Sequence, residues 1–183
     1  MSLHRTVVTW AALFALAIAI GAGTAYASHR LGCYKYADAS INWYNGGTGT
    51  YYYIFQEEAV TDSDSWHNYT DIDLTTVTSL GTTDHFSTYN GWYGENGWLG
   101  IADFISVAGD GCTVLYGRAR LNQSYLDGTY SRTQKEHIAC HEIGHLLGLA
   151  HLNDNSETCM ANSQDRNTPQ PDEHDQELIN SIY

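Results

Sequence analysis

The chain has 183 residues, with 21 Asp and Glu against 8 Lys and Arg, which gives a formal net charge of −13 at pH 7. This length suits one domain that buries a real hydrophobic core. The acidic balance and the lack of any basic run argue against nucleic acid and anionic lipid as partners, so we expect neither.

The chain begins with the pattern of an export signal. An apolar run over residues 7–22 follows Arg5 and ends in Ala25-Tyr26-Ala27. This predicts a signal peptide over residues 1–27, followed by a single domain over residues 28–183. An uncleaved membrane anchor is the alternative, but the run is short for a span of about 20 residues. We therefore expect a secreted, extracellular monomer with no membrane contact after cleavage.

Predicted strands and helices alternate along the rest of the chain. Strands are expected in β-prone runs bounded by turn residues, at Ile41–Tyr44, Ile72–Val77, His85–Tyr89, Leu99–Val107 and Val114–Leu121. Helices are expected from Thr50 to about Trp66, from Ser131 or Arg132 to Gly148, and from about Pro171 to Tyr183. The first helix should bury one apolar face, formed by Tyr51, Tyr52, Ile54, Phe55, Ala59 and Val60. This order predicts an α/β (α+β) sandwich with one twisted, mixed β-sheet.

The stretch from His141 to His151 carries the chemistry, because it reads H-E-x-x-H-x-x-G-x-x-H. His141 and His145 are four residues apart, so they share one helix face and their imidazoles can converge. Gly148 can adopt a positive φ, end the helix and turn the chain so that His151 becomes a third ligand. Three imidazoles with one open position are typical of a catalytic zinc. Ordinary polar residues on an amphipathic helix are the alternative, which the added G-x-x-H disfavours.

Glu142 distinguishes between classes of function. It is rotated by about 100° from His141 on the helix, so it can lie beside the metal instead of binding it. A protein that only binds zinc does not need this carboxylate, whereas a hydrolase uses it as a general base. A zinc hydrolase that acts on a substrate other than peptide stays open. His137 extends the ligand face, but a fourth ligand would close the site, so we expect a supporting or exposed residue.

These residues resemble the metzincin zinc metallopeptidases, and the matrixins in particular. Met160 resembles their Met-turn, and His174 to Tyr183 resembles their closing helix. The resemblance implies a metzincin-like zincin fold with an active-site helix and a C-terminal helix. It also implies a secreted zinc-dependent endopeptidase with one catalytic Zn²⁺ and a protein or peptide substrate. A segment similar to the substrate-binding edge strand of that family contains Leu99, Gly100, Ile101 and Ala102.

The four cysteines suggest two disulfides in an exported chain, with three possible pairings. Cys140 directly precedes His141, and Cys159 directly precedes Met160. A Met-turn beneath the zinc helix would make these two cysteines neighbours, so the resemblance favours Cys140–Cys159 and Cys33–Cys112. Cys140 as a zinc ligand is the alternative, but it lies one step from His141 and off the ligand face.

The sequence departs from the matrixin pattern in several places. No propeptide cysteine switch is recognisable, and Cys33 is the only candidate thiol near the expected mature start. Of the histidines needed for a second, structural zinc, only His85 is present between the strands. Ala161 follows Met160, so the tyrosine ligand of astacins is missing. The acidic residues fit no calcium-loop spacing, so a Ca²⁺ ion is possible but unsupported.

Overall fold

The computed structural model describes residues 29–61, 65–81, 85–153, 157–162 and 167–183. One five-stranded sheet forms the scaffold, in the order β2-β1-β3-β5-β4. Its strands are β1 (Ser40–Asn45), β2 (Asp73–Thr76), β3 (His85–Gly91), β4 (Gly100–Val107) and β5 (Val114–Asn122). The pairings of β1 with β2 and β3, and of β3 with β5, are parallel. Strand β4 pairs antiparallel with β5 and forms one edge of the sheet.

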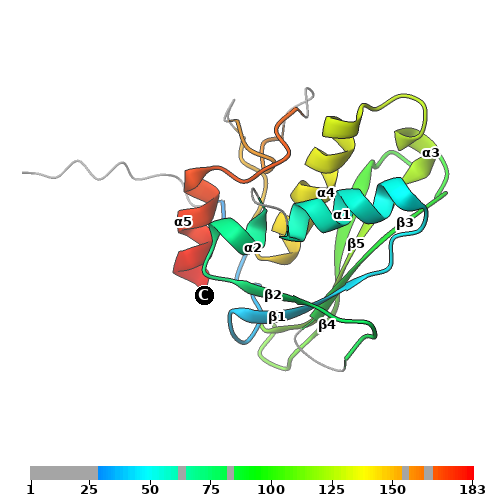
Figure 1. Cartoon of the computed structure of the whole chain (residues 1–183). Coiled ribbons are helices and arrows are strands. Elements are labelled where there is room, and N and C mark those ends of the chain that lie inside the picture. Colours follow the sequence, from blue (N-terminus) through cyan, green and yellow to red (C-terminus); the bar gives the residue numbers. More distant parts are fainter. Residues whose placement is uncertain (1–28, 62–64, 82–84, 154–156, 163–166) are drawn as a thin grey trace, which may run out of the picture.

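Helices α1 (Thr50–Thr61) and α4 (Arg132–Leu146) lie side by side over one face of this sheet (Figure 1). The other helices are α2 (Trp66–Tyr69), α3 (Gln123–Leu126) and α5 (Glu173–Ile182). Helix α4 contacts α1, β4 and β5, which places it behind the edge strand. Its first turn is fixed by a capping box between Ser131 and Gln134. A second capping box, between Asp172 and Asp175, starts α5.

The observed elements confirm the predicted fold class, a mixed sheet covered by helices. The five predicted strands are present, with ends that differ by one or two residues. The first helix ends at Thr61 instead of near Trp66, and Trp66 begins a separate short helix. Helix α3 was not predicted, because four residues are too few to show a helical period.

The prediction of which side chains form the buried face of α1 was partly wrong. Tyr52, Phe55, Ala59 and Val60 are buried, but Tyr51 is 70% exposed. Gln56 occupies the core side instead and is 1% exposed. Its Oε1 accepts a hydrogen bond from Thr88 Oγ1, so the buried amide is partly satisfied. A polar side chain can therefore take a core position that hydropathy alone assigns to apolar residues.

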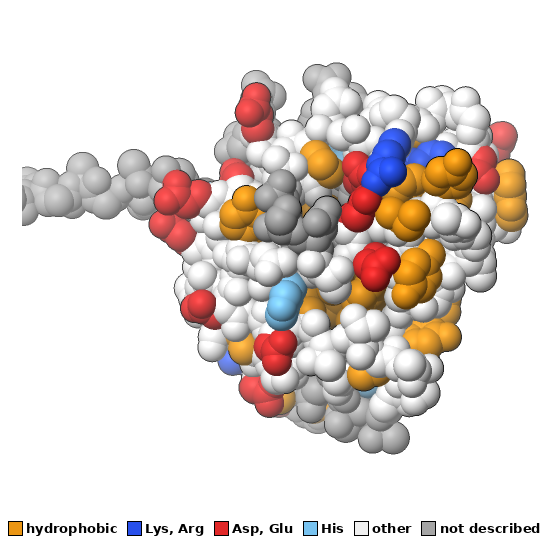
Figure 2. Space-filling view, viewed as in Figure 1, with side chains coloured by type: hydrophobic (Ala, Val, Ile, Leu, Met, Phe, Trp, Pro, Cys, Tyr) orange, Lys and Arg blue, Asp and Glu red, His pale blue; other side chains and the backbone are white. Residues whose placement is uncertain are grey.

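Two disulfides cross-link the fold, and they have the pairing that the sequence predicted. One joins Cys33 to Cys112, and the other joins Cys140 on α4 to Cys159. Within the described part of the chain, the helices are too short or too polar to cross a membrane. The predicted signal peptide over residues 1–27 lies outside the described residues. Figure 2 shows acidic side chains scattered over the face that it presents, with no continuous stripe of Lys and Arg.

Candidate metal centre

Three histidines converge beside the last turn of α4. The ring centroids of His141 and His145 are 4.5 Å apart, and those of His151 lie 4.9 and 4.8 Å from them. One ring nitrogen from each residue lies within 4.8 Å of the other two. This is the only group of three or more potential metal ligands among the residues that the structure describes. The two helical residues share a face because α4 is regular across positions 141 and 145.

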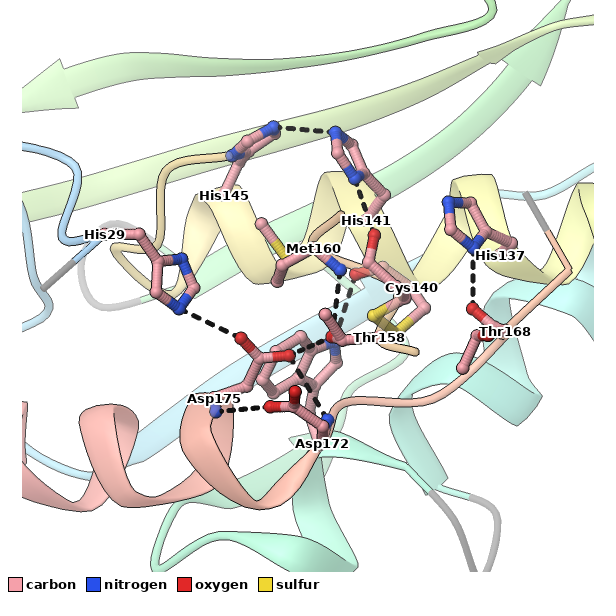
Figure 3. The surroundings of a disulfide bond; sticks show 12 residues. His29, His137, Cys140, His141, His145, Thr158, Met160, Thr168, Asp172 and Asp175 are labelled. Carbon is pink, nitrogen blue, oxygen red and sulfur yellow. Dashed lines mark hydrogen bonds and ion pairs between the residues drawn. A yellow bond between two sulfur atoms is a disulfide. The ribbon is translucent and has the colours of Figure 1, made fainter. Parts of the chain in front are cut away.

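Hydrogen bonds orient the two helical histidines toward each other (Figure 3). His141 Nδ1 lies 2.7 Å from the carbonyl oxygen of Cys159, and His145 Nδ1 lies 2.7 Å from that of Leu149. A carbonyl oxygen only accepts, so each Nδ1 carries the proton and each Nε2 presents a lone pair. The two Nε2 atoms are 3.0 Å apart. Facing lone pairs repel unless a cation or a proton lies between them, so this donor set suits a metal ion.

The protonation states of the histidines favour metal binding. Burial and, to a smaller extent, the neighbouring His145 lower the pKa of His141 to about 3. Burial also lowers the pKa of His145 to about 4. The pKa of His151 is lowered by burial as well. Since a neutral imidazole is the form that binds a metal, all three residues are ready ligands at neutral pH.

The turn after α4 brings His151 to the other two histidines. Gly148 has a φ of 101°, a conformation that residues with a side chain rarely adopt. A β-carbon at this position would also lie 2.6 Å from the carbonyl oxygen of Tyr34. The helix itself ends at Leu146, two residues earlier than expected. Gly148 therefore ends α4 and redirects the chain, which is the role that the motif spacing predicted.

Glu142 lies between α4 and the edge strand. Its side chain packs on Gly100, where an added β-carbon would come within 2.6 Å of both Cγ and Oε1. Glu142 is 7% exposed. Burial raises its pKa to about 8, and the charge of Asp103 on β4 adds to that shift. Gly100 thus provides the space that lets this carboxylate lie against the strand.

Met160 lies directly under the histidine helix. Its side chain is fully buried, and a β-carbon at Gly144 would lie 2.3 Å from its sulfur. The turn that carries Met160 is joined to α4 by the Cys140–Cys159 disulfide. The hydroxyl of Thr158 accepts a hydrogen bond from the backbone N–H of Met160, at 3.1 Å, and donates to Asp175. Met160 therefore packs beneath the helix that carries His141 and His145.

A pocket of about 270 Å³ opens at the histidine cluster. Its walls come from the edge strand and the loop before it, from α4, and from the turn after Met160. The lining residues are Gly97, Trp98, Leu99, Gly100, His137, Ile138, His141, Glu142, His151, Ala161 and Asn162. Of the predicted strand residues, Leu99 and Gly100 line the pocket, whereas Ile101 and Ala102 continue β4 away from it. Ala161 and Asn162 line the pocket on the side of the Met160 turn.

Sequence reasoning missed or misplaced some lining residues. Trp98 and Asn162 were not singled out, because nothing local indicates that their segments meet across the pocket. His137 was expected to be a supporting or an exposed residue, and with 3% exposure it is buried. Its Nδ1 donates to the carbonyl oxygen of Thr168 at 2.6 Å, which ties α4 to the segment before α5. It thus has a supporting position beside His141.

A family model described as matrixin matches residues 33–183. The chain belongs to the matrixin family. No curated protein matches it by sequence. Among solved structures, it is similar to myroilysin, with a TM-score of 0.55 and 13% identity, covering 84% of this chain and 97% of that one. It is also similar to an archaemetzincin from Archaeoglobus fulgidus solved with malonate, with a TM-score of 0.42 and 16% identity, covering 76% and 99% of the two chains.

Membership in the matrixins confirms the predicted resemblance and identifies the class of reaction. The protein is a zinc metallopeptidase, a hydrolase that acts on protein or peptide substrates. The family implies one catalytic zinc, and the cluster of His141, His145 and His151 fits such an ion. The similarity to myroilysin adds support for the zincin fold. Metal binding without turnover and hydrolysis of a substrate other than peptide are thereby disfavoured.

Proposed function

We propose that this matrixin is a secreted endopeptidase in which His141, His145 and His151 bind the catalytic zinc and Glu142 is the general base. The observation that carries the proposal is the shared pocket. Glu142 and two of the three histidines line one cavity of about 270 Å³, beside a free strand edge. An extended peptide can pair with such an edge by backbone hydrogen bonds, which is an endopeptidase mode of binding.

The chemical roles follow from the positions of the side chains. When bound, zinc lowers the pKa of a water molecule toward 7 and polarises the scissile carbonyl. Glu142 accepts the proton of the attacking water and transfers it to the leaving amine. Burial and, to a smaller extent, the charge of Asp103 raise the pKa of Glu142 to about 8. A cation held by the neighbouring histidines favours the carboxylate form, which is the form that a general base needs.

The edge strand orients the substrate in this proposal. Among the described strands, β4 pairs with β5 alone, so the backbone groups on its other side can pair with an extended peptide. Leu99 and Gly100 border the pocket and Ile101 and Ala102 continue the same strand, so all four provide the substrate strand. The scissile bond would then lie across the pocket from α4. This arrangement positions the carbonyl near Glu142 without requiring contacts to particular substrate side chains.

We also propose that residues 1–27 are a signal peptide and that residues 28–183 form one domain that is active as a monomer. The family match spans nearly the whole predicted mature region. The two disulfides suit an oxidising compartment outside the cytosol. Sequencing the N-terminus of exported protein tests the cleavage site, and analytical ultracentrifugation tests the monomer.

The decisive experiment is digestion of an unfolded protein substrate by the purified mature chain. Glu142→Gln should keep its zinc and lose at least about 10²-fold in kcat/KM, because an amide cannot accept the proton. Glu136→Gln is the matched control, since Glu136 lies on the same helix but does not line the pocket. A chelator should abolish wild-type cleavage, and added zinc should restore it. Wild-type activity in zinc-loaded Glu142→Gln would refute the general-base role.

A further inference from the structure

His151 is held differently from the other two histidines. His141 and His145 each donate Nδ1–H to a backbone carbonyl. Among the described residues, no hydrogen-bond partner is found for the ring of His151, and this residue is exposed. It also follows the turn at Gly148 and is not part of α4. The position of its ring therefore depends on the backbone that leads to it, residues 148–150.

The segment His29–Leu31 pairs with this backbone. Arg30 and Leu149 form an antiparallel bridge. Leu31 N–H donates to the Gly148 carbonyl at 2.7 Å, and Ala150 N–H donates to the His29 carbonyl at 2.5 Å. Gly148 and Ala150 thus form backbone hydrogen bonds with a segment more than a hundred positions away, and Leu149 between them is bridged to Arg30 of the same segment. The pairing fixes the direction in which the chain reaches His151.

The side chain of His29 connects the same backbone to α5. Its Nδ1 lies 2.8 Å from the Ala150 carbonyl oxygen, and its Nε2 lies 3.0 Å from Asp175 Oδ1. Both neighbours are acceptors, so the ring is best satisfied as an imidazolium beside a carboxylate. The pair is almost completely buried, with side-chain exposures of 5% for His29 and 0% for Asp175. Figure 3 shows His29 reaching from the N-terminal segment to the first turn of α5.

Asp175 continues the connection to the turn beneath the histidines. Its Oδ2 accepts from the hydroxyl of Thr158 and from Asp172 N–H, the latter at 3.2 Å. Thr158 in turn accepts from the backbone N–H of Met160. One buried ion pair therefore joins the segment before His151 to the turn that packs under α4. Removing the imidazole would leave the Asp175 carboxylate buried with fewer partners and the Ala150 carbonyl without its side-chain donor.

We propose that His29 is a positioning residue for His151. Its imidazole holds residues 148–150 against α5, and this contact keeps the ring of His151 directed at His141 and His145. The proposal rests on the proposed function in one respect, namely that His151 is a zinc ligand. His29 itself does not bind the metal or the substrate and acts only through the backbone that precedes the third ligand.

The test measures zinc affinity of the mature protein by competition with a chromophoric chelator. We expect His29→Ala to weaken zinc binding about tenfold, the lower end of the effect seen when a group supporting a ligand is removed. His29→Gln, which keeps a donor and an acceptor, should recover part of the loss. His67→Ala is the matched control, because His67 also lies near an aspartate, with 3.9 Å to Asp73, but on α2 and outside the cluster. It should bind zinc like the wild type.

A double-mutant comparison separates positioning from a general loss of stability. In a His151→Ala background, His29→Ala should cause no further loss of zinc affinity, because the residue through which it acts is gone. An equal loss in both backgrounds would overturn the proposal, as would wild-type affinity in folded His29→Ala. Unchanged zinc affinity in His151→Ala itself would instead refute the ligand assignment, and with it both proposals. Far-UV circular dichroism confirms that each variant is folded. If His29→Ala does not fold, the same comparison is made with His29→Gln.

Discussion

The sulfur of Met160 occupies the space that a side chain at Gly144 would need. A β-carbon there would lie 2.3 Å from Met160 Sδ and 2.7 Å from Cζ2 of Trp66. Both neighbours are fully buried, and Trp66 is further held by a hydrogen bond from its Nε1 to the Cys140 carbonyl, at 3.1 Å. The glycine in the last turn of α4 is therefore what lets the turn with Met160 pack against the histidine helix.

We predict that Gly144→Ala destabilises the protein despite alanine's better helix propensity. Overpacking typically costs about 1–3 kcal/mol, while the helix gains at most about 1 kcal/mol. Urea unfolding should show the loss. Gly109→Ala is the control, because an added β-carbon there has no neighbour within 4 Å. If Gly144→Ala were as stable as Gly109→Ala, the close packing of Met160 would be wrong.

A substitution at Gly100 should affect catalysis more than metal binding. The added β-carbon in Gly100→Ala would meet Cγ and Oε1 of Glu142 at 2.6 Å and push the carboxylate away from the strand. Since misplacement by about 1 Å can cost on the order of 10²-fold, we expect kcat/KM to fall by about tenfold or more. Zinc content should be unchanged, because none of the three histidines contacts that position closely. Gly109→Ala again provides the comparison, and equal activity of the two variants would contradict the prediction.

The two disulfides should have different effects when removed. The Cys140–Cys159 bridge spans 19 residues and joins α4 to the turn with Met160, whereas Cys33–Cys112 spans 79 residues. Chain entropy assigns about 3 kcal/mol to the first bridge and about 4 kcal/mol to the second. Because the first bridge joins the histidine helix to the Met160 turn, the double alanine variant of Cys140 and Cys159 should lose more zinc affinity than the variant of the other pair. The variant of Cys33 and Cys112 should show the larger fall in thermal stability.

Zinc titration and thermal unfolding of both variants decide this prediction. Non-reducing peptide mapping of the wild type comes first, because it establishes which cysteines are linked in solution. A Cys140 peptide joined to Cys33 or Cys112, or carrying a free thiol, would overturn the assignment. Equal zinc affinity in the two variants would show that the bridge beside the histidines does not hold the Met160 turn.

The pair of His29 and Asp175 predicts a pH-dependent stability. Burial by itself lowers the pKa of His29, but the Asp175 carboxylate and the Ala150 carbonyl outweigh it, so the pKa lies above the ordinary 6.5. Asp172 raises it further, while His145 on α4 is close enough to interact with the same charge. A pKa that is higher in the folded than in the unfolded state stabilises the fold below the unfolded value. That stabilisation is lost as pH rises through the folded pKa.

The wild type should therefore exceed His29→Gln in stability most strongly below about pH 6.5, with the difference shrinking at higher pH. The free energy of unfolding of both zinc-free proteins, measured across pH 5 to 9, gives this difference directly. Zinc is left out because its binding has a pH dependence of its own. A difference that grows with pH would mean that His29 is neutral in the folded protein.

The amino-acid sequence alone predicted the class of chemistry, a zinc-dependent hydrolysis. The spacing of His141, His145 and Gly148 is local, and the helical period converts it into a face and a turn without help from distant residues. The strands were also predictable, because short apolar runs between turn residues are a local signal. The family resemblance was also a local signal, because it depends mainly on the motif between His141 and His151.

The contacts that support the site could not be predicted in this way, because they join segments far apart in the chain. The strand order β2-β1-β3-β5-β4 and the free edge of β4 depend on pairings between segments far apart in the chain. Nothing near Gly144 in sequence indicates that Met160 would lie against it. The contact of His29 with Asp175 joins residues 146 positions apart, and nothing in the sequence around Asp175 indicates that His29 lies against it. Such contacts follow from the packing of the whole chain, because side-chain neighbours across a fold are set by long-range geometry and not by local periodicity.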